Sequence, residues 1–207
     1  MKRLALCLST FLLLLGAIPA QAAILTYRTL LEGLNEEPPN ESRGSGTATV
    51  IIDDVANTMS IGFSWAGLTS STTAAHIHCC TTEPFTGTSI PATMVPSFPD
   101  FPTDNRFSGL YEASFDLLDP ATYNPDFLTA SGGSVAEAEA AFLAGIASGR
   151  SYLNIHTELF PAGEIRGFLR PPPDGGTVPE PGSIALFSLG AAGLALLQRR
   201  RHVPAKA

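Results

Sequence analysis

The chain has 207 residues and is acidic, with 12 lysines and arginines against 19 aspartates and glutamates and a formal net charge of −7 at pH 7. Binding of nucleic acid depends on cations that neutralise phosphates, so this balance excludes a nucleic-acid-binding function. The length and the three cysteines also exclude a large multidomain protein and a small scaffold held by several disulfides.

The first 22 residues have the layout of a signal peptide. Lys2 and Arg3 precede an apolar stretch, Leu4 to Ile18, and the small residues Ala20 and Ala22 occupy the −3 and −1 positions that signal peptidase requires. The pattern predicts cleavage after Ala22 by signal peptidase and export of the rest of the chain. The alternative is that this segment, like the apolar segment near the other end, forms a short buried helix.

Seven short segments after the signal peptide have the character of β-strands. They are rich in β-branched and aromatic residues and are separated by Gly, Pro, Asn and Asp. The segments are Ile24–Leu31, Gly46–Asp53, Thr58–Ala66, Ala74–Cys79, Gly109–Leu117, Tyr152–Thr157 and Glu164–Arg170. Large apolar residues alternate with small ones in the third segment, and residues 54–57 before it predict a four-residue hairpin connection. The spacing predicts a mainly β domain, an antiparallel sandwich or barrel.

One α-helix is expected between the fifth and sixth strands. Ser134 is followed three residues later by Glu137, a capping box, and apolar residues then recur at helical spacing up to Gly149. We expect this inserted helix to pack across an opening of the sheet. The long stretch from Thr86 to Asn105, which contains several prolines and two phenylalanines, predicts a loop that is either functional or loosely ordered.

The mature domain contains one pair of cysteines, Cys79 and Cys80, because Cys7 leaves with the signal peptide. Adjacent residues lie only about 3.8 Å apart at Cα, which is shorter than the usual disulfide range, so a bond between them is expected to be strained. The open alternatives are a metal site, a bridge between two chains, and a pair of free thiols.

The C-terminal tail has the layout of a sorting signal. The sequence Val178-Pro179-Glu180-Pro181 is followed by an apolar run over residues 182–197 and by the cluster Arg199-Arg200-Arg201. Sixteen apolar residues are short for a permanent membrane span, and the cations after them favour the cytoplasmic side. The tail resembles a PEP-CTERM sorting signal. The resemblance implies export by a Gram-negative bacterium, transient anchoring in the inner membrane, and removal of the tail by an exosortase-type protease.

The two hydrophobic ends divide the chain into four parts. These are a signal peptide over residues 1–22, a β domain over 23–170, a linker over 171–177 and the sorting signal over 178–207. The part between the two ends has six arginines, no lysine and eighteen acidic residues, a net charge of −12. This charge favours solubility or the attraction of divalent cations.

Four motifs of the β domain occur in a recognisable order. They are Leu34–Pro39, Ala75–His78, Tyr152–Thr157 and Gly163–Gly167. Together, over roughly residues 25–169, they resemble the CHRD domain, which is repeated in the extracellular protein chordin and is found singly in exported bacterial proteins. The resemblance implies an immunoglobulin-like or barrel-like β domain that acts outside the cytoplasm.

All three histidines of the mature chain lie in these motifs. His76 and His78 are two apart on a predicted strand and therefore share a face, and His156 lies on another strand. Three imidazoles suit zinc or copper, and Cys80 is an optional fourth ligand if the strand continues. A similar His-x-His strand binds copper in Cu/Zn superoxide dismutases, but the further histidines and aspartate of a second metal site are absent here. The alternatives are histidines that only hydrogen-bond to neighbouring groups, and a general acid or base.

Glu164 and Arg166 are also two apart on one strand. We expect them to serve a structural role by pairing with each other, with Asn154 or Glu36 as further partners, and a ligand-gripping role for Arg166 is the alternative. No signature of a nucleophile elbow, phosphate loop, dinucleotide fold or zinc protease is present, so no enzymatic activity is expected.

Two functions follow from the sequence. The first is an exported structural or binding module at the cell surface or in extracellular polysaccharide. The second is an exported copper- or zinc-binding protein that uses His76, His78 and His156.

Overall fold

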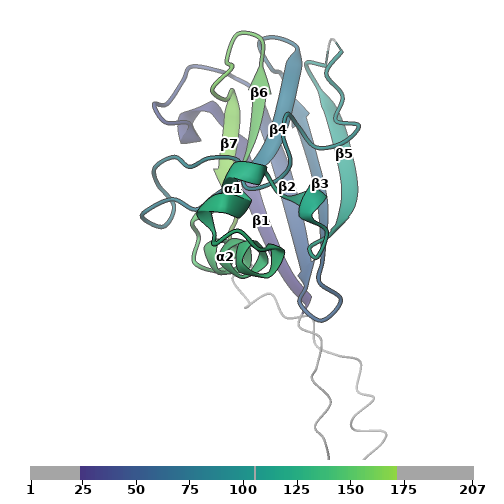
Figure 1. Ribbon diagram of the computed structural model, residues 1–207. Helices are drawn as coiled ribbons and strands as arrows, with labels where there is room; N and C mark the ends of the chain where they lie inside the picture. Colours follow the sequence, from purple (N-terminus) through teal and green to yellow (C-terminus); the bar gives the residue numbers. More distant parts are fainter. Residues whose placement is uncertain (1–23, 105, 172–207) are drawn as a thin grey trace, which may run out of the picture.

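The structure, a computed structural model, describes residues 24–104 and 106–171, which form a seven-stranded antiparallel sheet with two α-helices (Figure 1). The strands are β1 (Ile24–Glu32), β2 (Ser45–Asp53), β3 (Thr58–Ala66), β4 (Thr72–Cys79), β5 (Gly109–Asp116), β6 (Ser151–Thr157) and β7 (Ile165–Phe168). The helices are α1 (Pro125–Ala130) and α2 (Val135–Ala147), with short 3-10 turns η1 (Gly33–Asn35) and η2 (Pro120–Thr122). All seven predicted strands are present, each within two residues of its predicted bounds.

The predicted hairpin between β2 and β3 is also confirmed. The nine residues of β2 pair in register with the nine of β3, from Ser45 opposite Ala66 to Asp53 opposite Thr58. The Asp53 carboxylate accepts the backbone N–H groups of Val55 and Ala56 and so stabilises the turn. Asn57 has a φ of 53°, a left-handed conformation that asparagine tolerates better than most residues.

The strands form one continuous sheet that curls, and the predicted immunoglobulin-like sandwich is not confirmed. The order is β4-β6-β7-β1-β2-β3-β5, so two groups of strands meet at the neighbours β1 and β7. Their contact is short, with Glu32 opposite Arg166 and an isolated bridge between Arg28 and Arg170. A Cβ atom at Gly167 would collide with the backbone carbonyl of Leu30. Glycine at this position therefore lets β7 approach β1 closely enough to join the two groups.

This close approach gives a first prediction. Gly167→Ala is expected to lower the free energy of unfolding by about 2 kcal/mol, because the added methyl group overpacks the junction against backbone that cannot rotate away. Urea denaturation measures the change. Gly62→Ala on β3 is the matched control, since its Cβ would meet Glu112 at an ordinary 3.7 Å, and a loss of similar size there would contradict the explanation.

The hydrophobic core lies on one face of the curled sheet and includes residues from every strand. Phe63 and Trp65 of β3 pack with Tyr111 of β5 and with Phe98 and Phe101, at ring-centroid distances of 5.2 to 6.2 Å. Phe98 and Phe101 belong to the long connection between β4 and β5, and both are buried. The proline-rich stretch is therefore an ordered part of the core rather than a loose loop.

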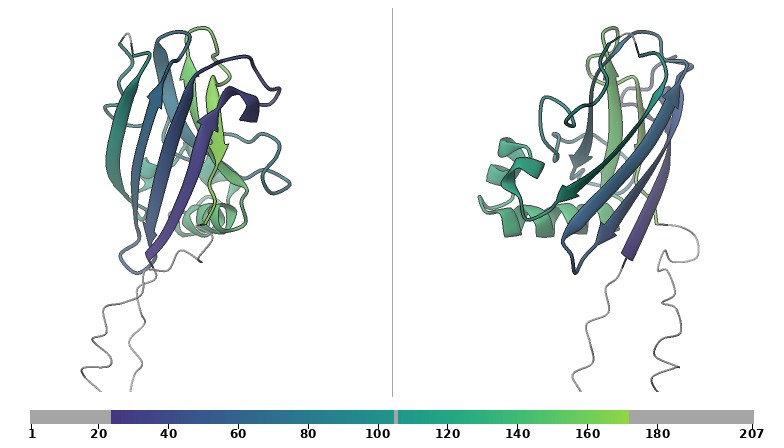
Figure 2. Two further views of the ribbon diagram at one scale, coloured as in Figure 1. Left: turned by 180° about the vertical axis from the view of Figure 1, so that it is seen from behind. Right: turned by 90° about the vertical axis from the view of Figure 1, so that its right-hand side faces the viewer.

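Both helices cover this core, on one side of the sheet near the start of β1 (Figure 2). Helix α2 is the predicted helix, and its capping box between Ser134 and Glu137 is formed. Helix α1 was not predicted, so the expectation of a single inserted helix is wrong. Its start carries a recognisable signal, because Asn124 caps it and Pro125 occupies the first position.

The two predicted targeting segments, residues 1–22 and 178–207, lie outside the described residues. Within the part of the chain that the structure describes, no helix combines the length and the apolar character needed to cross a membrane.

Candidate metal centre

The three histidines lie on the face of β4 and β6 that points away from the hydrophobic core. Register fixes this arrangement, because His76 pairs with Asn154 and His78 pairs with Tyr152, while His156 follows two residues after Asn154. The alternate residues of these strands, such as Ile77 and Leu153, are fully buried in the core. The same face continues onto β7, where Arg166 pairs with Asn154.

Each histidine uses one ring nitrogen to donate to a backbone carbonyl. Nε2 of His76 lies 2.7 Å from the Pro96 oxygen, Nδ1 of His78 lies 2.8 Å from the Ser89 oxygen, and Nδ1 of His156 lies 3.0 Å from the Pro161 oxygen. A neutral imidazole carries one N–H, so these bonds fix the tautomer and leave the other nitrogen as an acceptor. Metal-binding histidines are commonly held in this way.

The remaining nitrogens are buried and without a hydrogen-bond partner. They are Nδ1 of His76, Nε2 of His78 and Nε2 of His156. The three residues are only 6 to 9% exposed, and each has a ring nitrogen within 4.8 Å of the others. Metal–nitrogen bonds of about 2.0 Å place ligands roughly 3.5 Å apart, so the rings would close by about 1 Å around an ion. Buried polar atoms are normally satisfied, so three free acceptors in one place need an explanation.

The electrostatics of the site keep the histidines neutral. Burial is the largest cause that lowers the pKa of His76, to about 4, and the neighbouring His156 lowers it further. Burial also lowers the pKa of His78 to about 3 and lowers the pKa of His156. Backbone hydrogen bonds oppose these shifts without cancelling them. Because only a neutral imidazole binds a metal, all three ligands are ready at neutral pH.

The depressed pKa values predict how metal-free stability depends on pH. Unfolded histidines take up protons near pH 6.5, whereas folded His76 and His78 do so near 4 and 3. The unfolded state therefore binds more protons in this window, and the free energy of unfolding should fall as the pH falls from about 6.5 to 4. A His76→Gln/His78→Gln variant should show a shallower decline in urea denaturation at several pH values.

Comparison of the wild type with the His76→Gln/His78→Gln variant separates the contribution of the histidines from that of other titrating groups. Glu36 has a raised pKa of about 7, so its folded form takes up a proton first and gives a slope of opposite sign in both proteins. An identical decline in the wild type and the double variant would mean that the histidines are not buried as neutral groups.

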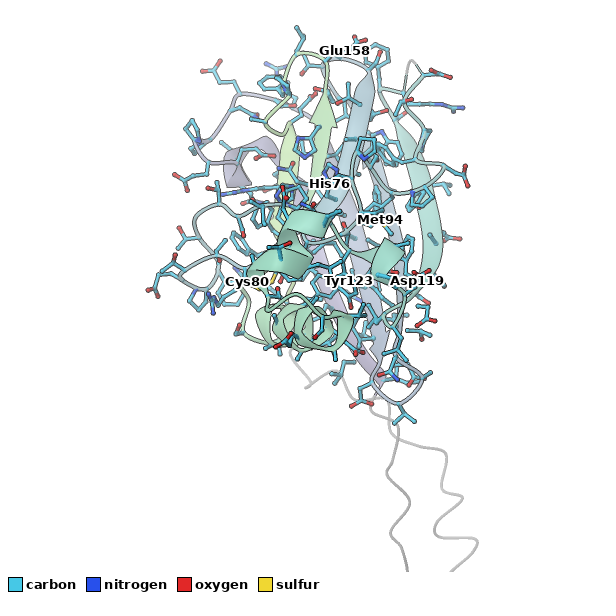
Figure 3. All side chains as sticks on the ribbon, viewed as in Figure 1. His76, Cys80, Met94, Asp119, Tyr123 and Glu158 are labelled. Atoms are coloured by element: carbon cyan, nitrogen blue, oxygen red, sulfur yellow. A yellow bond between two sulfur atoms is a disulfide. The ribbon has the colours of Figure 1, made fainter. Side chains whose placement is uncertain are left out.

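Cys80 is not part of the histidine cluster. Strand β4 ends at Cys79, and Cys80 forms a disulfide with Cys79. The Cys80 sulfur lies 3.5 Å from the Ala141 oxygen of α2, and Figure 3 places Cys80 at the level of the helices, with His76 above them on the sheet. The prediction that Cys80 is an optional ligand fails because the strand does not continue to residue 80. Of the alternatives for the pair, a bond between neighbours is the one that the structure contains.

Arg166 lies beside the cluster and has several partners. Its guanidinium donates to the backbone oxygens of Asn35 and Gly87, and its nitrogens approach Glu36 at 3.8 Å and Glu37 at 3.9 Å. Its Cζ also lies 4.7 Å from the centre of the Tyr152 ring. Glu36 is therefore a partner of Arg166, as predicted. Burial nevertheless outweighs Arg166 and raises the pKa of Glu36.

Tyr152 connects Arg166 to the histidines. Its ring is stacked on His78, with centroids 4.8 Å apart and planes 9° from parallel. Asn154, which lies between His76 and Arg166 across the strands, donates weakly to the Ala162 oxygen at 3.5 Å. The face thus runs from the histidines through Tyr152 and Asn154 to Arg166.

Glu164 has a separate, structural position. Its carboxylate is fully buried and accepts from the Ser42 hydroxyl and the Thr69 N–H at 2.6 Å, and from the Thr157 hydroxyl at 2.7 Å. The predicted pairing of Glu164 with Arg166 does not occur, because Glu164 immediately precedes β7 and points to other loops. The prediction of a structural role for Glu164 agrees with these contacts.

Matches to two known families together cover most of the chain. Residues 27–169 match the CHRD domain. The chain belongs to the CHRD domain family. Residues 177–201 match the PEP-CTERM protein-sorting motif, which indicates export and a place at the cell surface or outside the cell. No curated protein and no solved structure matches the chain.

The match places the candidate site inside the CHRD domain. His76, His78 and His156 lie in two of the motifs that carried the resemblance, and Glu164 and Arg166 lie in a third. The sequence did not reveal the groups that orient them. The three carbonyls that hold the histidines come from connecting segments, and only the prolines at positions 96 and 161 hint that these segments have fixed shapes.

A groove of about 790 Å³ lies at the far end of the same face of the CHRD domain. Of the six arginines within residues 24–171, three line it: Arg28, Arg166 and Arg170. Its other lining residues include Phe85, whose ring lies 3.8 Å from Arg170 Cζ. The groove thus combines charged groups with an aromatic surface, a common composition of ligand sites.

Proposed function

We propose that this exported CHRD-domain protein binds a copper or zinc ion outside the cytoplasm through His76, His78 and His156, without catalysing a reaction. The observation that carries the proposal is the set of three buried ring nitrogens that have no hydrogen-bond partner among the described residues. Each is unprotonated because the opposite nitrogen donates to a carbonyl. Such an arrangement costs folding energy unless an ion or an ordered water supplies the missing contact, and three converging acceptors suit an ion.

The position of the site supports the proposal further. The rings come from two adjacent strands of a sheet, which holds ligands more precisely than loops do. The sorting signal brings the domain to a compartment where metal ions are not buffered by cytoplasmic thiols.

Metal analysis of the full chain, exported to the periplasm of a Gram-negative host, tests the proposal. After exposure to copper and zinc and removal of loosely bound ions, the wild type should retain about one equivalent, and a variant with all three histidines changed to glutamine should retain less than a tenth. His202→Gln is the matched control, because it removes the histidine of the predicted sorting signal and leaves the three proposed ligands unchanged. Less than a tenth of an equivalent in the wild type would refute the proposal.

The second candidate is a structural or binding module for extracellular polysaccharide. The observation that favours it is the groove beside Arg166, where Arg28 and Arg170 are exposed near the ring of Phe85, which is 41% exposed. Sugars stack on aromatic rings and accept hydrogen bonds from guanidinium groups. The acidic domain would repel a polyanion, so this candidate favours a neutral polysaccharide.

The groove gives a prediction of its own. An Arg28→Gln/Arg170→Gln variant is expected to lose at least about tenfold in affinity for a neutral exopolysaccharide, because both exposed donors are weakened. Affinity electrophoresis in gels that contain the polysaccharide measures the change. Arg106→Gln, outside the groove, is the control, and equal retardation of all three proteins would exclude this candidate.

The last part of the proposal concerns how the protein is exported and processed. We infer that residues 182–197 hold the protein briefly in the inner membrane until an exosortase-type protease removes the tail. The sorting motif over residues 177–201 supports this processing step.

A further inference from the structure

The ligands of the three-histidine site carry no charge. Within the described residues, the group of side chains that can hold a metal contains His76, His78 and His156 and no Asp, Glu or Cys. The ion pairs that involve carboxylates on this face are both made by Arg166. A bound ion would therefore keep its full charge, because the described residues place neither a carboxylate nor a thiolate among its ligands.

The surroundings make a high charge costly. The three rings are at most 9% exposed, so an ion between them is largely removed from water. The electrostatic cost of this transfer rises with the square of the charge, so a divalent ion costs about four times as much as a monovalent ion of the same size. Sites for divalent ions usually offset this cost with anionic ligands or retained water.

A permanent cation behind the site adds to the cost. The Tyr152 ring is stacked on His78 at 4.8 Å, and the Arg166 guanidinium lies 4.7 Å from the centre of the same ring. The carboxylates that approach Arg166, those of Glu36 and Glu37, are 3.8 and 3.9 Å from its nitrogens and are engaged there. Within the described part of the chain, the histidine site therefore has no carboxylate that is not already engaged by Arg166.

The number of ligands also matters. Zinc takes four ligands, and divalent copper prefers a tetragonal arrangement. The structure brings three nitrogens together, and the carbonyls nearest the rings are already occupied by the opposite ring nitrogens. Monovalent copper has a filled d shell and accepts three ligands.

We propose that the three-histidine site selects monovalent copper, Cu(I), over zinc and divalent copper. The inference rests on the proposed function, since it assumes that the cluster binds a metal. Selection follows from a neutral, buried ligand set of three nitrogens beside a fixed cation.

Competition titrations of the full chain test the inference. Cu(I) is titrated anaerobically against a colorimetric Cu(I) chelator, and zinc and Cu(II) are titrated against chelators of known affinity. The dissociation constant for Cu(I) is expected to be at least 100-fold lower than that for either divalent ion. X-ray absorption of the Cu(I) complex should show three nitrogen ligands and no sulfur.

The outcomes separate this inference from the proposed function. Zinc or Cu(II) bound as tightly as Cu(I), with one equivalent lost in the triple histidine variant, would overturn the inference and leave metal binding intact. Absence of binding for every ion would overturn both.

A substitution that adds a negative charge tests whether the uncharged ligand set causes the selectivity for Cu(I). Asn154→Asp places a carboxylate next to His76 in the register and two residues before His156. Affinity for zinc should rise at least tenfold relative to affinity for Cu(I). An unchanged ratio in a folded variant, checked by circular dichroism, would contradict the role of charge.

Discussion

Replacing His78 with glutamine is expected to weaken metal binding at least about 100-fold, because one of the three proposed ligands is lost and the described residues bring no further His, Cys, Asp or Glu to the site. The residue is also the one that stacks on Tyr152, so its ring orientation is fixed both by stacking and by its bond to the Ser89 oxygen. Glutamine keeps a polar group of similar size but cannot reproduce the free ring nitrogen. Competition titration of the variant against the wild type measures the loss.

A control separates loss of a ligand from general disturbance. Thr93→Ser removes a methyl group from a buried residue whose hydroxyl accepts from the Ile77 N–H, next to both histidines, and keeps that hydrogen bond. It should change metal affinity by less than about threefold. A His78→Gln variant that binds as tightly as the wild type would show that the cluster is not the metal site.

The same three histidines are also expected to affect the stability of the metal-free protein. Three buried acceptors without partners destabilise the fold, since each forfeits its hydrogen bond to water. A domain that only needed a stable sheet would gain by carrying apolar residues at these positions. A bound ion, as proposed above, would supply the contacts that packing does not.

The β-strands were predictable because their pattern is local. Apolar residues of β3 alternate with Ser60, Gly62 and Ser64, and the structure buries the first set and leaves the second on the other face. The same periodicity placed His76 and His78 on one side of β4. The capping box of α2 was equally local and is formed as predicted.

The arrangement of the strands was not predictable in the same way. Nothing in the local pattern of β7 shows that it adds to β1, because that junction depends on the missing side chain of Gly167 and on a hydrogen bond from Asn35 to the Arg166 oxygen. The partners of Glu164 come from positions 42, 69 and 157, which are far apart in sequence. Such contacts depend on how the sheet curls.

Glu164 is the second position where a large effect is expected. Its carboxylate receives three hydrogen bonds, from Ser42 after η1, from Thr69 after β3 and from Thr157 at the end of β6. Its own backbone also joins this part of the sheet, because its N–H donates to Ile155 and its oxygen accepts from the Asn40 amide. One side chain thus connects three segments at the end of the domain.

Glu164→Ala is expected to lower the free energy of unfolding by about 3 to 5 kcal/mol, since it leaves the donors of Ser42, Thr69 and Thr157 without their shared acceptor and opens a cavity at a fully buried position. Glu164→Gln should cost less, about 2 kcal/mol, because the amide keeps one oxygen but turns an N–H group toward donors. Urea denaturation of the metal-free protein measures both. Glu112→Ala, at an exposed position of β5, should change stability by less than about 0.5 kcal/mol, and a loss as small as this in Glu164→Ala would mean that the three segments are held together by other contacts.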